Sequence, residues 1–475
     1  MKRLSSLITL LSSALIAGQA VSQTPGKLEP FGLSGKRVAA LAAAQHFSSP
    51  NSFLYAVTEG DGVYRRALDP VDSTWRDLGL KGKKLSALDI QIWGAGPAIF
   101  HTPVVGVAPD FAQADSTLIY RFTNNRWVPS DSGIFKKSSI GSLASFASSG
   151  HEPPGQTFAS GGRLFYRSNS LSRWWTKIFD FGLGWYINTT AVFQKYGDDA
   201  IWVGGVTEGA LAWMAKSTDY GETWKHFYPP PSVLDGNACR SLVIHPDSAD
   251  IVYAGMYGAV IKTTNGGKTW QLTGLEKTQT YFHGLSLDPF DLNHIYAGGT
   301  KANQWALWES FDAGVTWKEI PPPVLLTPVV VSGITSIVAD RYAAGVTYIA
   351  TLGHGVWKYQ SVITNVNDRR EQTAPKEFAL EQNYPNPFSA SGTSKTSETV
   401  VYYSLASPQT VKLEVYNVLG ELVATLVDGA KPAGEHGIRW NARNTLGALV
   451  PAGIYFYRLH LGAKRVAVRK MILLH

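Results

Sequence analysis

Charged residues and cysteine are scarce in this chain. Asp, Glu, Lys and Arg make up 17% of its 475 residues, below the roughly 25% usual in globular domains. The single cysteine, Cys239, excludes a disulfide scaffold and a cysteine-based zinc site. Aromatic residues reach 12%, which excludes a disordered chain, because disorder accompanies high charge and few aromatics. The length allows roughly three domains, or one large β domain and a small one.

Long apolar runs are also missing after the N-terminus, so we expect no membrane span. Lys2 and Arg3 precede a mostly apolar, uncharged stretch, residues 4–17, which is too short to cross a bilayer core of ~30 Å as a helix. Small residues follow it, with cleavage expected after Ala20 or Ser22. This pattern predicts a secretory signal peptide over residues 1–22; a buried first helix is the alternative. No cysteine follows the apolar stretch, so a lipoprotein anchor is not expected.

The formal net charge of +7 suggests at first a nucleic-acid or membrane-surface partner. Most of the excess, however, lies in the signal peptide and after residue 361. The part between them is nearly neutral. We therefore expect no nucleic-acid partner.

A repeated motif, S/T-x-D/N-x-G-x-T-W, dominates the middle of the chain. Weaker copies end at Trp75, Trp127 and Trp175, and the six terminal tryptophans are 46 to 52 residues apart. That period is typical of a four-stranded propeller blade of ~40–50 residues. The three full copies consist of Ser217, Asp219, Gly221, Thr223 and Trp224; of Thr263, Asn265, Gly267, Thr269 and Trp270; and of Ser310, Asp312, Gly314, Thr316 and Trp317.

Each repeat predicts strands A, B and C, the motif, and then strand D. A seventh B–C hairpin, residues 348–357, has no motif and no strand D after it. Residues 28–33 resemble residues 75–80, the strand D of the first repeat. We therefore predict an all-β protein with a seven-bladed β-propeller over residues 23–360. Its N-terminal strand supplies strand D of the last blade, which removes the open sheet edge.

The repeated motif resembles the Asp-box of the bacterial neuraminidase repeat, found in sialidase-like and xyloglucanase-like propellers. In that family the boxes lie on the face opposite the ligand site. The chemistry favours structural roles, since Asp or Asn can accept backbone N–H bonds in a tight turn and Gly supplies a positive φ. We therefore interpret Asp219 and Asp312 as turn stabilisers and not as catalytic acids, and the tryptophans as packing between blades.

After residue 360 the pattern changes. Residues 361–377 are polar and read as a linker, and residues 378–475 alternate apolar and polar residues between Gly, Pro and Asn turns, which predicts a small Ig-like β-sandwich. The segments Asn-Tyr-Pro-Asn-Pro-Phe at 383–388, Val-Tyr-Asn-Val-Leu-Gly at 415–420 and Gly-Ile-Tyr-Phe-Tyr-Arg-Leu at 453–459 carry a further resemblance. They are similar to the type A C-terminal sorting domain of the type IX secretion system.

That resemblance implies a Bacteroidetes-type Gram-negative source and export through the Sec and type IX secretion machinery. It also implies removal of the domain, with attachment to surface lipopolysaccharide or release. The protein would then be secreted or surface-bound by way of the periplasm. An ordinary Ig-like module that binds or spaces is the alternative.

In such a propeller the B–C turns and D–A connections gather on one face, around the central channel. Residues expected there mix aromatic and charged types, which suits a carbohydrate or peptide ligand. The ligand-binding candidates are Arg37, Trp185, Tyr186, Arg240, Tyr257, Tyr281, His283, Lys301, Trp305 and His354. Glu59 and Lys84 are expected on the same face.

No known catalytic set matches these residues. Sialidases with this box need an arginine triad and a Tyr nucleophile with its Glu, and glycosidases need two carboxylates about 5–9.5 Å apart. Asp61, Glu208 and Asp235 are the candidates for such a pair. No metal-ligand spacing or cofactor motif is present, and residues 288–293 predict a turn more than a calcium loop. A binding propeller is therefore the leading hypothesis, and a polysaccharide-active hydrolase or lyase is the alternative.

Overall fold

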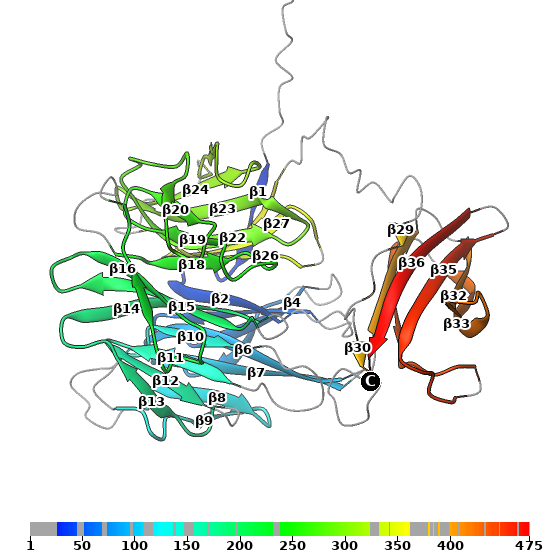
Figure 1. Cartoon of the computed structure of the whole chain (residues 1–475). Coiled ribbons are helices and arrows are strands. Elements are labelled where there is room, and N and C mark those ends of the chain that lie inside the picture. Colours follow the sequence, from blue (N-terminus) through cyan, green and yellow to red (C-terminus); the bar gives the residue numbers. More distant parts are fainter. Residues whose placement is uncertain are drawn as a thin grey trace, which may run out of the picture. The chain divides into compact units, whose positions relative to one another are not determined.

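The computed structural model divides into two compact units at residues 363 and 364. Figure 1 colours the first unit blue to yellow and the second orange to red. The predicted signal peptide lies outside the described residues, as does nearly all of the predicted linker, so both stay predictions. The described residues are 26–44, 52–68, 74–95, 98–108, 117–135, 139–146, 156–168, 172–194, 198–230, 238–323, 332–341, 343–361, 379–380, 383, 388–389, 399–405, 409–431, 434–445, 447–462 and 465–474.

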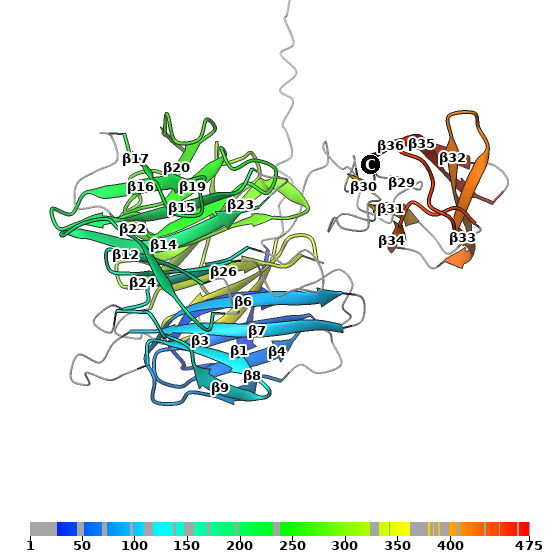
Figure 2. The same ribbon diagram turned by 60° about the horizontal axis from the view of Figure 1, so that its bottom comes forward.

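Seven four-stranded sheets make up the described part of the first unit, which confirms the predicted seven-bladed propeller (Figures 1 and 2). In six of these blades four consecutive strands, A to D, pair in chain order. Blade 1 holds β2 (Val38–Ala44), β3 (Phe53–Thr58), β4 (Val63–Ala67) and β5 (Arg76–Gly79); blade 2 holds β6 (Leu85–Ala95), β7 (Ala98–Val107), β8 (Ile119–Thr123) and β9 (Arg126–Pro129); blade 3 holds β10 (Ser142–Ser145), β11 (Thr157–Gly161), β12 (Leu164–Ser168) and β13 (Thr176–Asp180).

The next three blades repeat this order. Blade 4 holds β14 (Trp185–Phe193), β15 (Ala200–Thr207), β16 (Ala212–Ser217) and β17 (Lys225–Phe227); blade 5 holds β18 (Ser241–Ile244), β19 (Val252–Gly255), β20 (Val260–Thr263) and β21 (Gln271–Leu272); blade 6 holds β22 (Thr280–Asp288), β23 (Asp291–Lys301), β24 (Gln304–Ser310) and β25 (Lys318–Ile320). Strand B is deeply buried, as in β19, because it lies inside its sheet. Its short apolar sequence fits that position.

Blade 7 is built from both ends of the propeller. It contains β26 (Ile334–Ala339), β27 (Val346–Thr351) and β28 (Gly355–Gln360), and its fourth strand is β1 (Lys27–Gly32). β1 pairs antiparallel with β28, with Leu28 opposite Tyr359 and Pro30 opposite Trp357. The outermost position tolerates Pro30, because no further strand needs its missing N–H. The predicted closure is confirmed, and it ties the N-terminus into the last blade.

The three full motifs form the turns between strands C and D. In the first, the Ser217 hydroxyl accepts a hydrogen bond from Gly221 N at 2.8 Å. Asp219 accepts bonds from Thr223 N at 2.9 Å and from the Thr223 hydroxyl at 2.5 Å. Burial opposes ionisation, but these bonds outweigh it and lower the pKa of Asp219. Gly221 has a φ of 94°, so the motif is a closed turn whose parts bond to one another.

The backbone bonds recur in the other two motifs, and each motif glycine packs on the preceding blade. Asp312 accepts from Thr316 N at 2.8 Å, and Asn265 accepts from Thr269 N at 2.9 Å. A Cβ on Gly267, which has a φ of 84°, would stand 2.9 Å from the Trp202 ring. Since strands alternate in direction, these C–D turns lie at the opposite end of each blade from the B–C turns.

The repeated tryptophans use two kinds of contact. In two of the three full motifs the indole N–H returns to the motif itself: Trp224 donates to Gly221 O at 2.9 Å and Trp317 to Gly314 O at 3.0 Å. In the weaker copies it reaches the preceding blade, since Trp127 donates to Leu78 O at 2.7 Å and Trp175 to Ser130 O at 2.6 Å. The weaker copies therefore replace a bond within the turn by a bond between blades.

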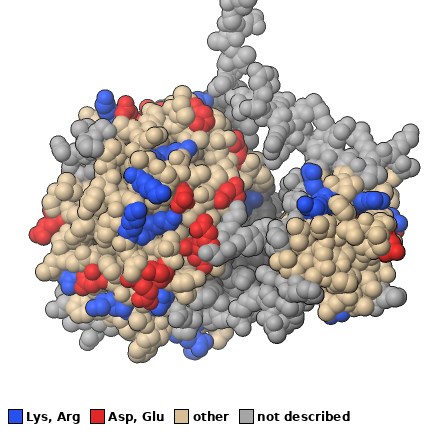
Figure 3. All heavy atoms as spheres, viewed as in Figure 1, with Lys and Arg blue, Asp and Glu red and all other residues tan. Residues whose placement is uncertain are grey.

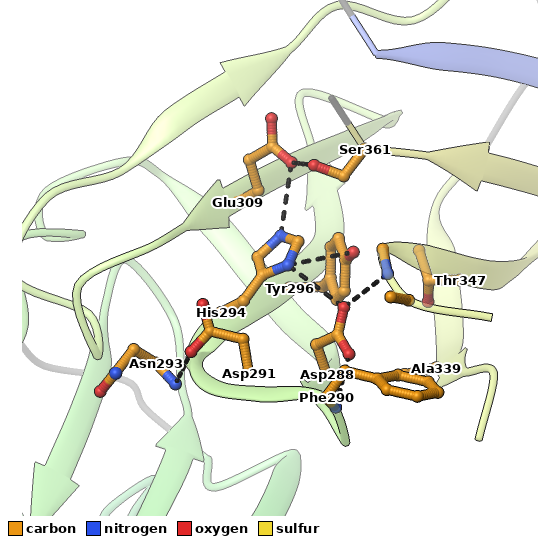
Figure 4. A network of polar contacts seen from close by, with 12 residues as sticks. Asp288, Phe290, Asp291, Asn293, His294, Tyr296, Glu309, Ala339, Thr347 and Ser361 are labelled. Carbon is orange, nitrogen blue, oxygen red and sulfur yellow. Dashed lines mark hydrogen bonds and ion pairs between the residues drawn. The ribbon is translucent and has the colours of Figure 1, made fainter. Parts of the chain in front are cut away.

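A buried polar network joins blade 6 to blade 7 (Figure 4). His294 in β23 lies between Asp288 at the end of β22, 3.3 Å from Nδ1, and Glu309 in β24, 3.6 Å from Nε2. All three side chains are at most 3% exposed. Glu309 accepts bonds from the Tyr359 hydroxyl at 2.9 Å and the Ser361 hydroxyl at 2.7 Å. The network thus fastens the end of the propeller to blade 6.

The second unit is a small two-sheet sandwich, as predicted. A three-stranded sheet has the order β29-β31-β34, and a five-stranded sheet has the order β30-β36-β35-β32-β33. Asn383 is buried and pins the sheets together, because its N–H donates to the Tyr457 hydroxyl at 2.7 Å and its amide to Thr399 at 2.9 Å. The strands are β29 (Ala379–Leu380), β30 (Phe388–Ser389), β31 (Thr399–Leu405), β32 (Gln409–Asn417), β33 (Leu422–Lys431), β34 (Gly434–Trp440), β35 (Gly453–Leu461) and β36 (Arg465–Leu474).

No helix in the described part of the chain has the length and apolar character needed to cross a membrane. On the face of the first unit that Figure 3 presents, basic and acidic side chains are interspersed. Among the described residues of the first unit, Lys216 pairs with Asp250 at 2.7 Å and Arg163 with Asp180 at 2.8 Å.

Candidate ligand-binding face

The B–C turns and D–A connections are bonded to one another from blade to blade. Gly82 N donates to Gly60 O at 2.7 Å, joining blades 1 and 2, and Gly258 N donates to Thr280 O at 2.7 Å, joining blades 5 and 6. Glu59 and Lys84 form an isolated β-bridge between blades 1 and 2. The backbone therefore brings the predicted loops to one end of the ring, which we call the channel face.

On blade 1 the channel-face charges neutralise one another. The Arg37 side chain pairs with Glu59 at 2.8 Å, and Lys36 pairs with Asp61 at 3.2 Å. His354 of blade 7 is half-buried, and burial lowers its pKa. The first proposed catalytic carboxylate, Asp61, is thus held by a neighbouring cation.

On blade 4 the channel face carries apolar and aromatic side chains. Tyr186 is 47% exposed, Leu183 83% and Leu211 61%. Trp185 is partly buried and packs against the Trp213 ring with centroids 5.0 Å apart. Glu208, the second proposed catalytic carboxylate, is exposed on this blade.

Blades 5 and 6 bring four of the predicted residues together. The Tyr257 and Tyr281 rings lie with centroids 4.5 Å apart, and the two residues form a β-bridge. The Arg240 guanidinium lies over the Tyr281 ring at 5.0 Å. Burial and the positive charge of Arg240 lower the pKa of His283 to about 4, so this imidazole is neutral at neutral pH.

The remaining candidates lie apart from this cluster. Lys301 is 3.7 Å from Glu319 and lies over the Trp308 ring. Trp305 differs from the expectation of a ligand contact: it is 4% exposed and packs against Trp357, because its ring fills the core between blades 6 and 7. Asp235 lies outside the described residues.

A β-bulge recurs near the channel face in the innermost strand. The register of strand A against strand B shifts around Ala39, Ser86, Asn188, His283 and Thr335. In each case one residue of strand A is left without a partner in strand B. Bulges of this kind redirect a side chain out of the ladder.

Blades 3 and 5 have an equivalent residue just before strand A. Gly141 N donates to Ser160 O, and Arg240 N donates to Gly255 O. The residue that accepts this bond also pairs with the first residue of strand A. Ser160 pairs with Ser142 in blade 3, and Gly255 pairs with Ser241 in blade 5. We call the seven equivalent residues the ring positions: Ala39, Ser86, Gly141, Asn188, Arg240, His283 and Thr335.

Three ring positions join neighbouring blades. The Ser86 hydroxyl donates to Ile140 O at 2.7 Å, the Asn188 amide donates to Cys239 O at 3.2 Å, and the Thr335 hydroxyl donates to Val38 O at 2.7 Å. Each acceptor directly precedes the ring position of the next blade. Sequence analysis missed this pattern, although a short polar residue at the start of three inner strands was a visible signal.

Comparison with known proteins finds a family model that matches part of the C-terminal unit, and distant relatives that match part of the chain. The model of the FlgD Ig-like domain matches residues 388–462. A xyloglucanase of Hypocrea jecorina is 24% identical over 142 residues, which is 30% of this chain and 17% of that enzyme. Xyloglucanase Xgh74A of Acetivibrio thermocellus is 28% identical over 146 residues, 27% of this chain and 17% of the enzyme. The chain thus spans less than a fifth of the length of these relatives.

Solved structures with a similar fold include YCF48 bound to D1 peptide, with a TM-score of 0.48 and 13% identity over 74% of this chain and 100% of that one. PorZ of the type IX secretion system of Porphyromonas gingivalis has a TM-score of 0.44 and 13% identity, over 91% of this chain and 59% of PorZ. The extracellular domain of BT4673 from B. thetaiotaomicron has a TM-score of 0.49 and 12% identity, over 80% of this chain and 46% of that chain.

Proposed function

We propose that this chain is an exported propeller protein that binds a glycan on the channel face of blades 4 to 6. The observation that carries the proposal is the group of accessible aromatic rings there, with Tyr186 47% and Tyr281 39% exposed and Tyr257 beside Tyr281. Flat aromatic faces beside a few polar groups are typical of sugar sites. The distant xyloglucanase relatives support a glycan over other ligands.

Export would use the Sec pathway and then the type IX secretion system, with the C-terminal Ig-like unit as the sorting signal. The apolar N-terminal segment and the segments at 383–388, 415–420 and 453–459 support this route. Removing residues 378–475 should leave the propeller in the periplasm of its native host. Normal surface display of the truncated protein would refute the route and leave the glycan proposal intact.

Binding is tested by titrating the full chain with a panel of soluble glycans that includes xyloglucan oligosaccharides. The double variant Tyr257→Ala, Tyr281→Ala should lose binding, because it removes the stacking rings. Tyr220→Ala is the matched control, since Tyr220 is also 39% exposed but lies in a C–D turn. Equal binding by both variants would contradict the proposed site.

The hydrolase alternative has a weaker basis in the described residues. Asp61 is paired with Lys36 on blade 1, whereas Glu208 lies on blade 4. Reducing-end release from any glycan of the panel that disappears in Glu208→Gln or Asp61→Asn would establish it, and would refute a binding-only function.

A further inference from the structure

The seven ring positions are equivalent in backbone position, but their side chains make different contacts. Ser86, Asn188 and Thr335 bond to the next blade, and Ala39 and Gly141 carry no polar side chain. The two that remain, Arg240 and His283, are neighbours on blades 5 and 6. They are also the only two ring positions that carry a titratable side chain.

Within the described residues neither of these two side chains makes a hydrogen bond to a neighbouring blade, and Arg240 meets blade 6 through the Tyr281 ring. From blade 5 to blade 6 the bond comes instead from Ser241, whose hydroxyl donates to Phe282 O at 3.0 Å. Within the described residues the Arg240 guanidinium has no carboxylate partner, and its buried Nε has no hydrogen-bond acceptor. His283 likewise makes no side-chain hydrogen bond within the described residues. A partly buried cation without a counter-charge is costly in the free protein.

Neighbouring residues position the side chains of Arg240 and His283. Tyr281 carries Arg240 on its ring, and Tyr257 packs against Tyr281. The His283 bulge turns its side chain out of the β22–β23 ladder. On the neighbouring blade 4, Tyr186 near the start of β14 is also exposed. A guanidinium, a neutral imidazole and tyrosine rings are thus grouped at one side of the channel face.

We propose that Arg240 and His283 bind the carboxylate of an acidic glycan, while Tyr257 and Tyr281 contact the sugar ring that carries it. A guanidinium matches a carboxylate with two parallel hydrogen bonds, and a neutral imidazole N–H can donate a third. A charge of this kind, which has no carboxylate partner among the described residues, favours an anionic over a neutral ligand. The inference rests on the proposed glycan-binding function and specifies its ligand class.

The test compares a hexamer of galacturonic acid with its fully methyl-esterified form, using the full chain and isothermal titration calorimetry. The two probes differ only at their six carboxyl groups, each of which is either charged or carries a small methyl group. We expect the acid to bind at least about tenfold more tightly, as a charged hydrogen bond allows. Arg240→Met should lower the affinity for the acid to that for the ester, and it should leave the affinity for the ester unchanged.

Two controls separate charge at this site from charge in general. Arg37→Met removes an arginine of the same face that is already paired with Glu59, and it should leave the preference for the acid intact. Arg240→Lys keeps the positive charge but loses the paired N–H donors of the guanidinium, so it should retain part of the preference for the acid. Thermal unfolding of each variant checks that it is folded.

Equal affinity for acid and ester, or a preference that survives Arg240→Met, would overturn the inference while leaving glycan binding in place. Arg240-dependent binding of an acidic peptide, with no binding of either hexamer, would overturn the glycan class. If no glycan of the wider panel binds at all, the proposed function itself fails, and the inference fails with it.

Discussion

The buried network of Asp288, His294 and Glu309 allows a quantitative test of how the propeller is held closed (Figure 4). Burial alone would lower the pKa of His294, but the hydrogen bonds and charges of Asp288 and Glu309 outweigh it and raise that pKa. Burial would raise the pKa of Glu309, but hydrogen bonds from Ser361 and Tyr359 and the nearby charge of His294 lower it. The two carboxylates therefore favour the protonated form of the His294 imidazole.

The pH dependence follows from these directions. An imidazole in the unfolded chain titrates near pH 6.5. Because the folded pKa is raised, the stabilisation by His294 is fully present below about pH 6.5 and is lost as pH rises through the folded pKa. The stabilisation by Glu309 has the opposite sign, since its folded pKa is lowered. It is lost as pH falls through that value.

Glu309→Gln removes one charge of the network and leaves His294 buried with one partner. Breaking a buried ion pair in this way costs about 3–5 kcal/mol in the free energy of unfolding. Asp180→Asn is the matched control, because Asp180 pairs with Arg163 at 2.8 Å on the surface, with side chains 34% and 39% exposed. An exposed pair of this kind contributes about 0–1 kcal/mol.

Urea unfolding followed by tryptophan fluorescence measures the difference, since Trp440 alone among the tryptophans lies in the second unit. We expect Glu309→Gln to lower the unfolding midpoint far more than Asp180→Asn. We also expect the loss of stability with rising pH to begin closer to pH 6.5 in Glu309→Gln than in the wild-type protein. The reasoning is refuted if both variants lose the same stability and the wild-type protein shows no decline as His294 titrates.

Three further outcomes are expected. Gly267→Ala should destabilise the propeller more than Gly258→Ala in urea unfolding, since both have positive φ but only Gly267 faces a ring at 2.9 Å. Deletion of residues 27–32 should abolish cooperative unfolding of the first unit, because blade 7 would lose its fourth strand. Asn383→Ala should lower the stability of the second unit, read from Trp440 in a variant with no other tryptophan, by about 1–3 kcal/mol for the unpaired buried groups.

The fold could be predicted because its signals are local in sequence. Each motif bonds within itself, as Asp219 does with Thr223, so the motif and its spacing identify the turns. Counting hairpins then showed that the last blade lacked one strand, which residues 28–33 could supply. Because neighbouring strands run in opposite directions, the order of the strands was enough to assign the ligand-binding candidates to the channel face.

The grouping of those candidates could not be predicted in the same way. Arg240 and Tyr281 are far apart in sequence, and only the packing of blade 5 on blade 6 places one over the other. The ring positions depend on bulges, and the short polar residues at three of them did not by themselves mark the other four. Asp288 was read as part of a turn, and it does accept a bond from Phe290 N. Its pairing with His294 needed the fold of blade 6.

A crystal structure of the full chain with a bound oligogalacturonate tests the location of the site most directly. The account predicts a carboxylate against Arg240 and His283, with its sugar ring on Tyr281. A ligand seated over the Arg37–Glu59 pair, or at the C–D turns on the opposite face, would contradict it.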